Sequence, residues 1–107
     1  MAVRKRNTNA RGSSWTQDEI IAVWKKALTV PGRDPNVIRK DSCGAWIEFS
    51  KYGDVTPNGK GWEIDHIKPV SHGGSDHISN LQPLQWENNR SKGDNWPNWS
   101  CLIKAVS

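Results

Sequence analysis

The fold of this 107-residue chain is decided by the stretch GWEIDHIKPVSHGGSDHISNLQPLQWENNRSKGDN, residues 61–95. It begins with Trp62–Ile67, where apolar and polar residues alternate as they do in a half-buried strand. A glycine-containing loop follows at Ser71–Asn80. Leu81–Trp86 then predicts a short edge strand, because the proline within it cannot donate a hydrogen bond to a neighbour. Glu87–Lys92 predicts a short helix, so the expected order is strand, long loop, strand, helix.

Two polar side chains, Asp65 and His66, follow each other inside the first of these strands. Neighbours on a strand point to opposite faces, so the two are not expected to bind the same ion. A carboxylate is a hard oxygen ligand suited to Mg²⁺ or Mn²⁺. A neutral imidazole, with a pKa of about 6.5, accepts a proton from water. A metal ion and a base on either side of one phosphate supply what phosphodiester hydrolysis needs. Amide oxygens and cations for the same site are available in the predicted helix, at Asn88, Asn89, Arg90 and Lys92.

These residues resemble the motif of the HNH endonuclease family. Asp65-His66 is followed after thirteen residues by Asn80 and after eight more by Asn89, which is similar to the variant whose final His is Asn. The resemblance covers Gly61–Asn95, about a third of the chain. It implies a ββα-metal site in which Asp65 and Asn89 bind one divalent ion, Mg²⁺ or Mn²⁺, and His66 is the general base. It also implies that Asn80 ties the long loop to the strand and so orients His66.

The same resemblance suggests roles for the other residues of the last helix. Arg90 and Lys92 are expected to contact phosphate, and Asn88 is expected to lie at the surface. Many family members clamp the motif with a structural zinc ion held by paired cysteines. Here Gln85-Trp86-Glu87 stands where a CxxC often lies, so the tryptophans and the first helix are expected to supply that support, without structural zinc.

The two cysteines, Cys43 and Cys101, are isolated and form no CxxC pair. Neither a zinc site nor a disulfide framework is indicated by this spacing. We expect two buried or half-buried thiols rather than a bridge.

The net charge of +4 is concentrated in residues 1–14, which hold four basic residues and no acidic one, while the rest holds eleven of each. We therefore expect residues 1–14 to form a flexible basic arm. Such an arm is a candidate contact for the DNA backbone, weakened by salt, through Arg4, Lys5 and Arg6. A solubilising tail is the alternative. A backbone-contacting arm predicts that deleting residues 1–12 weakens binding at low salt and leaves the chemistry intact.

The first half of the chain predicts one helix and one strand. Thr16 and Glu19 fit a capping box, and apolar residues then recur at helical spacing until Pro31-Gly32 ends the helix. Asp34–Asp41 is polar and rich in turn residues. Ala45–Phe49 has strand character.

These elements predict a small α+β fold: residues 15–107 form one domain with an N-terminal helix, a β-hairpin and the ββα-metal motif, centred on residues 61–95. Tryptophan provides a large apolar area per residue, and we expect core positions for Trp62, Trp86, Trp96 and Trp99. No apolar run is long enough to cross a membrane, and the first residues contain no apolar segment typical of a secretion signal. A cytoplasmic location is therefore expected.

The leading hypothesis is a metal-dependent endonuclease that hydrolyses DNA, nicking one strand as a monomer, with a homodimer or a targeting partner as further possibilities. One alternative is a nucleic-acid-binding or regulatory module with an HNH fold that does not cut. Another is a zinc-stabilised interaction domain, which the few cysteines disfavour. The roles of Glu63, His72 and His77 stay open: Glu63 shares a strand face with Asp65, and both histidines are expected to be exposed loop residues.

Overall fold

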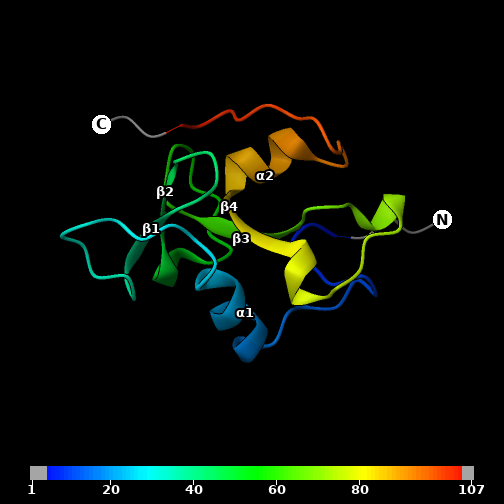
Figure 1. Ribbon diagram of the computed structural model, residues 1–107, viewed down its shortest axis with the longest axis horizontal. Helices are drawn as coiled ribbons and strands as arrows, with labels where there is room; N and C mark the ends of the chain where they lie inside the picture. The colour runs from blue at the N-terminus through cyan, green and yellow to red at the C-terminus, as the bar shows by residue number, and fades with distance from the viewer. Residues whose placement is uncertain (1–4, 105–107) are drawn as a thin grey trace.

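The computed structural model describes residues 5–104 (Figure 1). Its helices and strands follow in the order α1 (Gln17–Trp24), β1 (Ile38–Lys40), β2 (Trp46–Glu48), β3 (Trp62–His66), β4 (Leu81–Gln85) and α2 (Trp86–Lys92). Within this range β1 pairs with β2 and β3 pairs with β4, both antiparallel. The α+β class is therefore confirmed. Arg4, predicted to contact DNA, lies outside the described residues.

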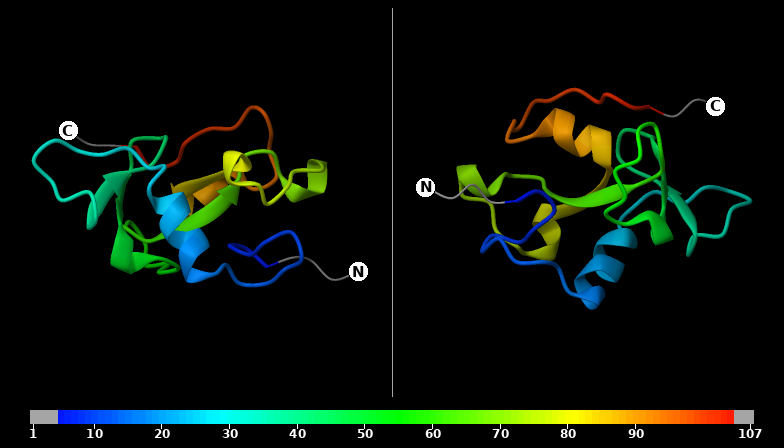
Figure 2. Two further views of the ribbon diagram at one scale, coloured as in Figure 1. Left: turned by 60° about the horizontal axis from the view of Figure 1, so that its bottom comes forward. Right: turned by 180° about the vertical axis from the view of Figure 1, so that it is seen from behind.

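The order strand, loop, strand, helix is confirmed for the second half of the chain. Strand β3 pairs with β4 so that Asp65 lies opposite Gln82 and Ile64 lies opposite Pro83. Helix α2 follows β4 without a loop, because Gln85 both ends the strand and caps the helix by accepting from the backbone N–H groups of Glu87 and Asn88. The β3–β4 hairpin lies between the two helices, with α1 against one face and α2 against the other (Figures 1 and 2).

Helix α1 starts at the predicted capping box and ends earlier than predicted. Thr16 Oγ1 accepts from the N–H of Glu19 at 3.1 Å, and Glu19 Oε1 accepts from the N–H of Thr16 at 2.9 Å. The helix stops at Trp24 rather than running on to the Pro-Gly pair. Leu28 instead exchanges backbone hydrogen bonds with Lys40, at 2.8 and 2.9 Å. This strand-like pairing replaces the last helical turn.

The polar segment Asp34–Asp41, predicted to form turns, contains strand β1. The strand has only three residues, and its partners are the three residues of β2, Trp46–Glu48. Because it forms by pairing with β2 and with Leu28, which folding brings beside it, the local sequence pattern does not reveal it. The predicted strand over Ala45–Phe49 is β2.

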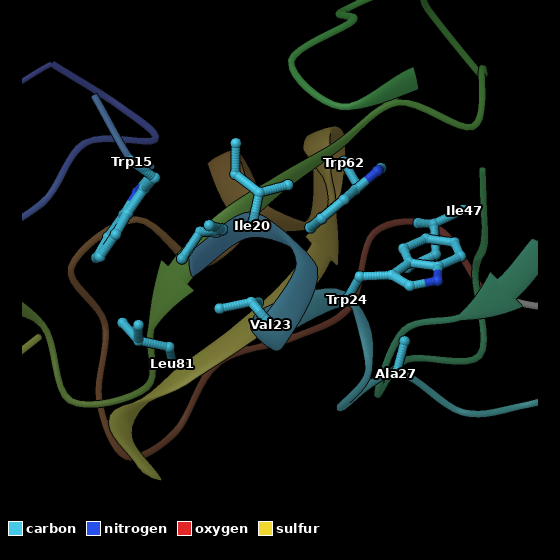
Figure 3. Packing of buried hydrophobic residues seen from close by; sticks show 9 residues of the cluster. Trp15, Ile20, Val23, Trp24, Ala27, Ile47, Trp62 and Leu81 are labelled. Carbon is cyan, nitrogen blue, oxygen red and sulfur yellow. The ribbon is translucent and has the colours of Figure 1, made fainter. Parts of the chain in front are cut away.

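The hydrophobic core lies between α1 and the β3–β4 hairpin, and Figure 3 shows its residues from close by. Trp62 is completely buried, as predicted, and its ring lies 5.3 Å from that of Trp24. The prediction was wrong for Trp96, which is 42% exposed. Trp86 and Trp99 are only partly buried. Trp86 is the first residue of α2, and Trp96 and Trp99 lie in the segment after it; none of the three belongs to the hydrophobic cluster around α1.

The prediction of free thiols was wrong, because Cys43 and Cys101 form a disulfide across 58 residues of sequence. After α2 the chain turns back along that helix and runs toward the β1–β2 sheet (Figure 1). The bridge therefore joins the turn between β1 and β2 to the C-terminal segment. No helix among residues 5–104 is long and apolar enough to span a membrane.

Candidate active site

Strand β3 carries the predicted site, and all five of its residues are buried. Side chains alternate along a strand, so Glu63 and Asp65 face α2, while Trp62 and Ile64 pack into the core beside α1. Burial on both faces means that each polar side chain of this strand needs a partner within the protein. These partners come from β4, α2 and the long loop.

The carboxyl group of Asp65 is 6% exposed and has two neighbours that donate hydrogen bonds. Lys92 Nζ lies 3.1 Å from Oδ1, and Gln82 Nε2 lies 2.9 Å from Oδ2. Burial raises the pKa of Asp65, and this effect outweighs the hydrogen bond from Gln82 and the charge of Lys92, which act in the opposite direction. The neighbours of Asp65 thus offset only part of the cost of burying its negative charge.

Asn89 is orientated by Glu63, whose role the sequence left open. Asn89 Nδ2 donates to Glu63 Oε1 at 3.0 Å, and Glu63 is 4% exposed. A carboxylate only accepts, so the amide must present its nitrogen to Glu63 and its oxygen elsewhere. Within residues 5–104 that oxygen accepts no hydrogen bond, which leaves Oδ1 available as a ligand.

Asn80 fastens the long loop to the end of β3. Its Oδ1 accepts from the backbone N–H of Lys68 at 2.8 Å, and its Nδ2 donates to the carbonyl groups of Lys68 and Ser75 at 3.1 and 2.8 Å. A backbone bond of 2.7 Å from Ile67 N to Asn80 O adds to this connection. The loop is thereby held beside His66.

His66 is 4% exposed and has a charged partner that the sequence analysis did not identify. Its Nε2 lies 2.7 Å from Oδ1 of Asp76, a residue of the long loop. The imidazole also packs against the indole of Trp15, with ring centroids 5.6 Å apart. The available signal was the position of Asp76 four residues before Asn80, since a loop fastened to β3 brings its own acidic residues close to the strand.

The two expected phosphate contacts on α2 occupy different environments. Lys92 is only 1% exposed, and its ammonium donates to Asp65 Oδ1 and to the backbone carbonyl of His66 at 2.9 Å. It therefore serves the buried site rather than facing an approaching phosphate. Arg90 is exposed, and its guanidinium lies 4.8 Å from the ring centre of Trp86.

Asn88 does not lie at the surface, contrary to the prediction, because it is completely buried. Its carboxamide bonds to Asp41 and to the backbone of Leu102 and Ile103. The C-terminal segment covers this side of α2 and supplies those backbone groups. The loop histidines are exposed, as expected: His72 Nε2 lies 3.0 Å from the carbonyl oxygen of Asp94, and His77 Nδ1 lies 2.8 Å from Ser79 Oγ.

A cavity of about 250 Å³ brings the three central residues of the motif together. Its lining includes Asp65, His66 and Asn89, together with Asp94 and the basic residues Lys5 and Arg6. The volume is enough for several small polar groups. Acidic, amide and imidazole groups therefore share one chamber with two cations.

Residues of the N-terminal arm form one wall of this cavity. Asn7 Oδ1 accepts from the backbone N–H of Ile64 at 2.8 Å and from the hydroxyl of Tyr52 at 3.1 Å. The backbone N–H of Ala10 donates to the carboxylate of Asp76. The bond between Asn7 and Ile64 fastens the arm to β3 at the residue before Asp65.

The donor set suits a hard divalent ion with few protein ligands. No group of three or more His, Cys, Asp or Glu side chains that could hold a metal ion occurs in residues 5–104. Asp65 and Asn89 offer one carboxylate and one amide oxygen. Mg²⁺ is commonly held by one or two such groups, with water and substrate phosphate completing its shell. The residues present therefore fit a divalent ion of this kind.

A model of the HNH endonuclease family matches residues 42–95, slightly more than half of the chain. The chain belongs to the HNH endonuclease family. The match extends from the turn that holds Cys43 through α2, so it covers more than the 61–95 motif. HNH nucleases typically use a divalent metal ion and act on DNA. Searches of curated proteins and of solved structures returned no significant match.

Proposed function

We propose that this HNH domain is a metal-dependent endonuclease that hydrolyses DNA phosphodiester bonds and nicks one strand per encounter. The observation that carries the proposal is the shared cavity of Asp65, His66 and Asn89, lined in addition by Lys5 and Arg6. A base, two oxygen ligands and two cations around one chamber suit a phosphodiester better than a neutral ligand.

His66 is the general base in this proposal. Its Nε2 is engaged by Asp76, whereas Nδ1 makes no hydrogen bond within the described residues. Nδ1 therefore takes a proton from a water molecule in the cavity, and that water attacks phosphorus opposite the departing 3′ oxygen. Because the imidazole is fixed by Asp76 and packed against Trp15, little reorganisation precedes the proton transfer.

Asp65 and Asn89 would hold the divalent ion, Mg²⁺ or Mn²⁺. When bound, the ion supplies positive charge that stabilises the phosphate and the departing oxygen in the transition state. Lys92 and Gln82 fix the Asp65 carboxylate, and Glu63 fixes the Asn89 amide. The supporting hydrogen bonds thus hold both ligand groups in orientation before an ion arrives.

Lys5 and Arg6 are placed to contact the phosphates of the bound strand, since they line the cavity without an acidic partner among the hydrogen bonds and ion pairs of residues 5–104. Arg90 does not line the cavity and would contact a more distant phosphate. These contacts are to the backbone, so they favour binding with little dependence on base sequence.

The test is a supercoiled-plasmid nicking assay in Mg²⁺, in Mn²⁺ and in EDTA, with His66→Ala beside the unaltered protein. We expect nicking that requires the ion and a loss of about 100- to 10,000-fold in His66→Ala, the usual contribution of a general base. DNA affinity should survive this substitution. His77→Ala is the matched control, because this exposed histidine lies in the long loop and makes only local hydrogen bonds.

Wild-type activity in His66→Ala would remove the proposed base. DNA binding without nicking in either ion would favour the non-cutting module instead. Asp65→Ala adds a second check, since it should reduce both the rate and the affinity for the divalent ion.

A further inference from the structure

We propose that Asp76 is a positioning residue for His66 and that the N-terminal arm holds Asp76 in place. In this arrangement Asp76 keeps the imidazole proton on Nε2, so that Nδ1 is the nitrogen that accepts a proton from water. The inference rests on the proposed function of His66 as the base, and it adds a residue and a structural dependence that the HNH motif residues do not include.

The contact between Asp76 and His66 is short and protected. Oδ1 of Asp76 lies 2.7 Å from Nε2, with the His66 side chain 3% exposed and the Asp76 side chain 35% exposed. A carboxylate only accepts a hydrogen bond, so the facing ring nitrogen must carry the proton. In a neutral imidazole the other nitrogen is then the basic one. The orientation that frees Nδ1 is therefore set by Asp76.

The loop that carries Asp76 is held close to β3 by its own sequence. Asn80 Nδ2 donates to the carbonyl of Ser75, the residue before Asp76, at 2.8 Å. At Gly74 a Cβ atom would come within 1.7 Å of the backbone oxygen of Lys68, so only glycine permits this close approach. The position of the Asp76 carboxylate is thus prepared by the loop rather than left to a mobile side chain.

The N-terminal arm supplies the remaining support. The backbone N–H of Ala10 lies 2.9 Å from Oδ1 and 3.2 Å from Oδ2 of Asp76. The arm is also fastened to β3 through Asn7 and the N–H of Ile64. A chain of contacts therefore runs from the arm through Asp76 to the ring of His66. This predicts that deleting residues 1–12 lowers the catalytic rate as well as DNA binding, in contrast to the expectation from sequence.

The experiment compares Asp76→Ala and Asp76→Asn in the full-length chain with the plasmid assay, separating kcat from KM. We expect kcat to fall by about 10- to 100-fold in Asp76→Ala, less than for removal of the base itself. KM should stay within about twofold, because Asp76 does not contact the phosphate in this proposal. Asp76→Asn is isosteric and keeps an oxygen acceptor, so it should recover part of the rate. Asp18→Ala is the matched control, since it removes an exposed acidic group of α1 that neither lines the cavity nor bonds to His66.

A second measurement does not depend on cleavage. Nitrogen-15 NMR of the imidazole in the metal-free protein, at a pH where the ring is neutral, should show the proton of His66 on Nε2 in the unaltered chain. A mixture of the two tautomers is expected in Asp76→Ala. This readout tests the positioning role even if the protein proves not to cut DNA.

An unchanged kcat together with an unchanged tautomer in Asp76→Ala would overturn the proposal. Deletion of residues 1–12 that alters KM alone would overturn the part assigned to the arm. Should Asp76→Ala fail to fold, the same two measurements on Asp76→Leu decide, because leucine is similar in size and offers no acceptor to Nε2.

Discussion

Two neighbouring asparagines of α2, Asn88 and Asn89, show how one short helix serves two polar clusters. Asn88 joins Asp41 and the C-terminal segment, whereas Asn89 joins Glu63 at the wall of the cavity. Successive residues of a helix point in directions about 100° apart, so adjacent side chains reach different surroundings. Identical chemistry is therefore used for structure at one position and, in our proposal, for metal binding at the next.

The cluster around Asn88 is closed, since every oxygen and nitrogen of its two central side chains has a partner. Asp41 accepts from the backbone N–H groups of Cys43, Ala45 and Gln85 and from Asn88 Nδ2. Asn88 in turn accepts from the N–H groups of Leu102 and Ile103. Asp41, Gln85 and Asn88 are all 0% exposed. A buried network with all partners in place stabilises one arrangement of the chain.

The cluster around Asn89 is open toward the cavity. Asn89 Oδ1 and His66 Nδ1 make no hydrogen bonds within residues 5–104. The other polar atom of each side chain is hydrogen-bonded, Asn89 Nδ2 to Glu63 and His66 Nε2 to Asp76. Groups held on one side and free on the other are suited to binding and proton transfer. The functional cluster thus differs from the structural one in these two unpaired atoms, whereas both oxygens of Asp65 accept hydrogen bonds, from Lys92 and Gln82.

The closed cluster also accounts for the absence of the paired cysteines. Gln85-Trp86-Glu87 stands where many HNH proteins carry a CxxC, and the sequence led us to expect support from tryptophans and the first helix. Trp15, Trp24 and Trp62 do pack with α1 in the core. The structure adds the carboxylate of Asp41 with Gln85 and Asn88, reinforced by the Cys43–Cys101 bridge. Hydrogen bonds and a disulfide thus hold α2 and the β1–β2 sheet together at this position.

The largest effect is expected from removing the centre of the closed cluster. Asp41→Ala leaves the backbone N–H groups of Cys43, Ala45 and Gln85 without an acceptor, so the free energy of unfolding should fall by about 3–5 kcal/mol. Urea unfolding followed by fluorescence measures this change. The fraction that remains folded should still nick DNA at the unaltered rate, because Asp41 does not line the cavity. Asp18→Ala, at an exposed position in the first turn of α1, should cost no more than about 1 kcal/mol. If Asp41→Ala also cost no more than about 1 kcal/mol, the cluster around Asn88 would have no structural role.

Loss of the disulfide should have the next largest effect. Replacing Cys43 and Cys101 together by serine removes a crosslink that closes a loop of 58 residues, which should lower the free energy of unfolding by about 2–4 kcal/mol. Calorimetry with and without reductant is the measurement, and reductant should shift only the unaltered protein. The nicking rate at saturating divalent ion should not change. A lower rate in the folded double variant would mean that the bridge shapes the open cluster as well.

The sequence predicted those features that local patterns encode. Alternation marked β3, the capping box marked the start of α1, and the spacing of the motif brought attention to Asp65, His66 and Asn89. It could not reveal β1, a three-residue strand that forms only where the folded chain brings β2 and Leu28 beside it. The disulfide and the burial of Asn88 were missed for a related reason, since both depend on the C-terminal segment returning along α2. Asp76 was overlooked because only the folded loop brings it to His66.

The smallest of these effects, and the most direct test of the comparison, comes from matched changes in the two asparagines. Asn89→Ala removes one of the two proposed ligands, so divalent-ion binding and nicking should weaken by about 100-fold, at least as much as loss of a supporting group costs, while unfolding changes little. Asn88→Ala should leave nicking intact and lower the free energy of unfolding by about 2 kcal/mol, because two partly buried backbone N–H groups, of Leu102 and Ile103, lose their acceptor. Isothermal titration with Mn²⁺ and thermal unfolding of both variants separate the two roles. If Asn88→Ala also lost ion binding, the two clusters would act as one, and a fully paired side chain could not be taken as a mark of structure alone.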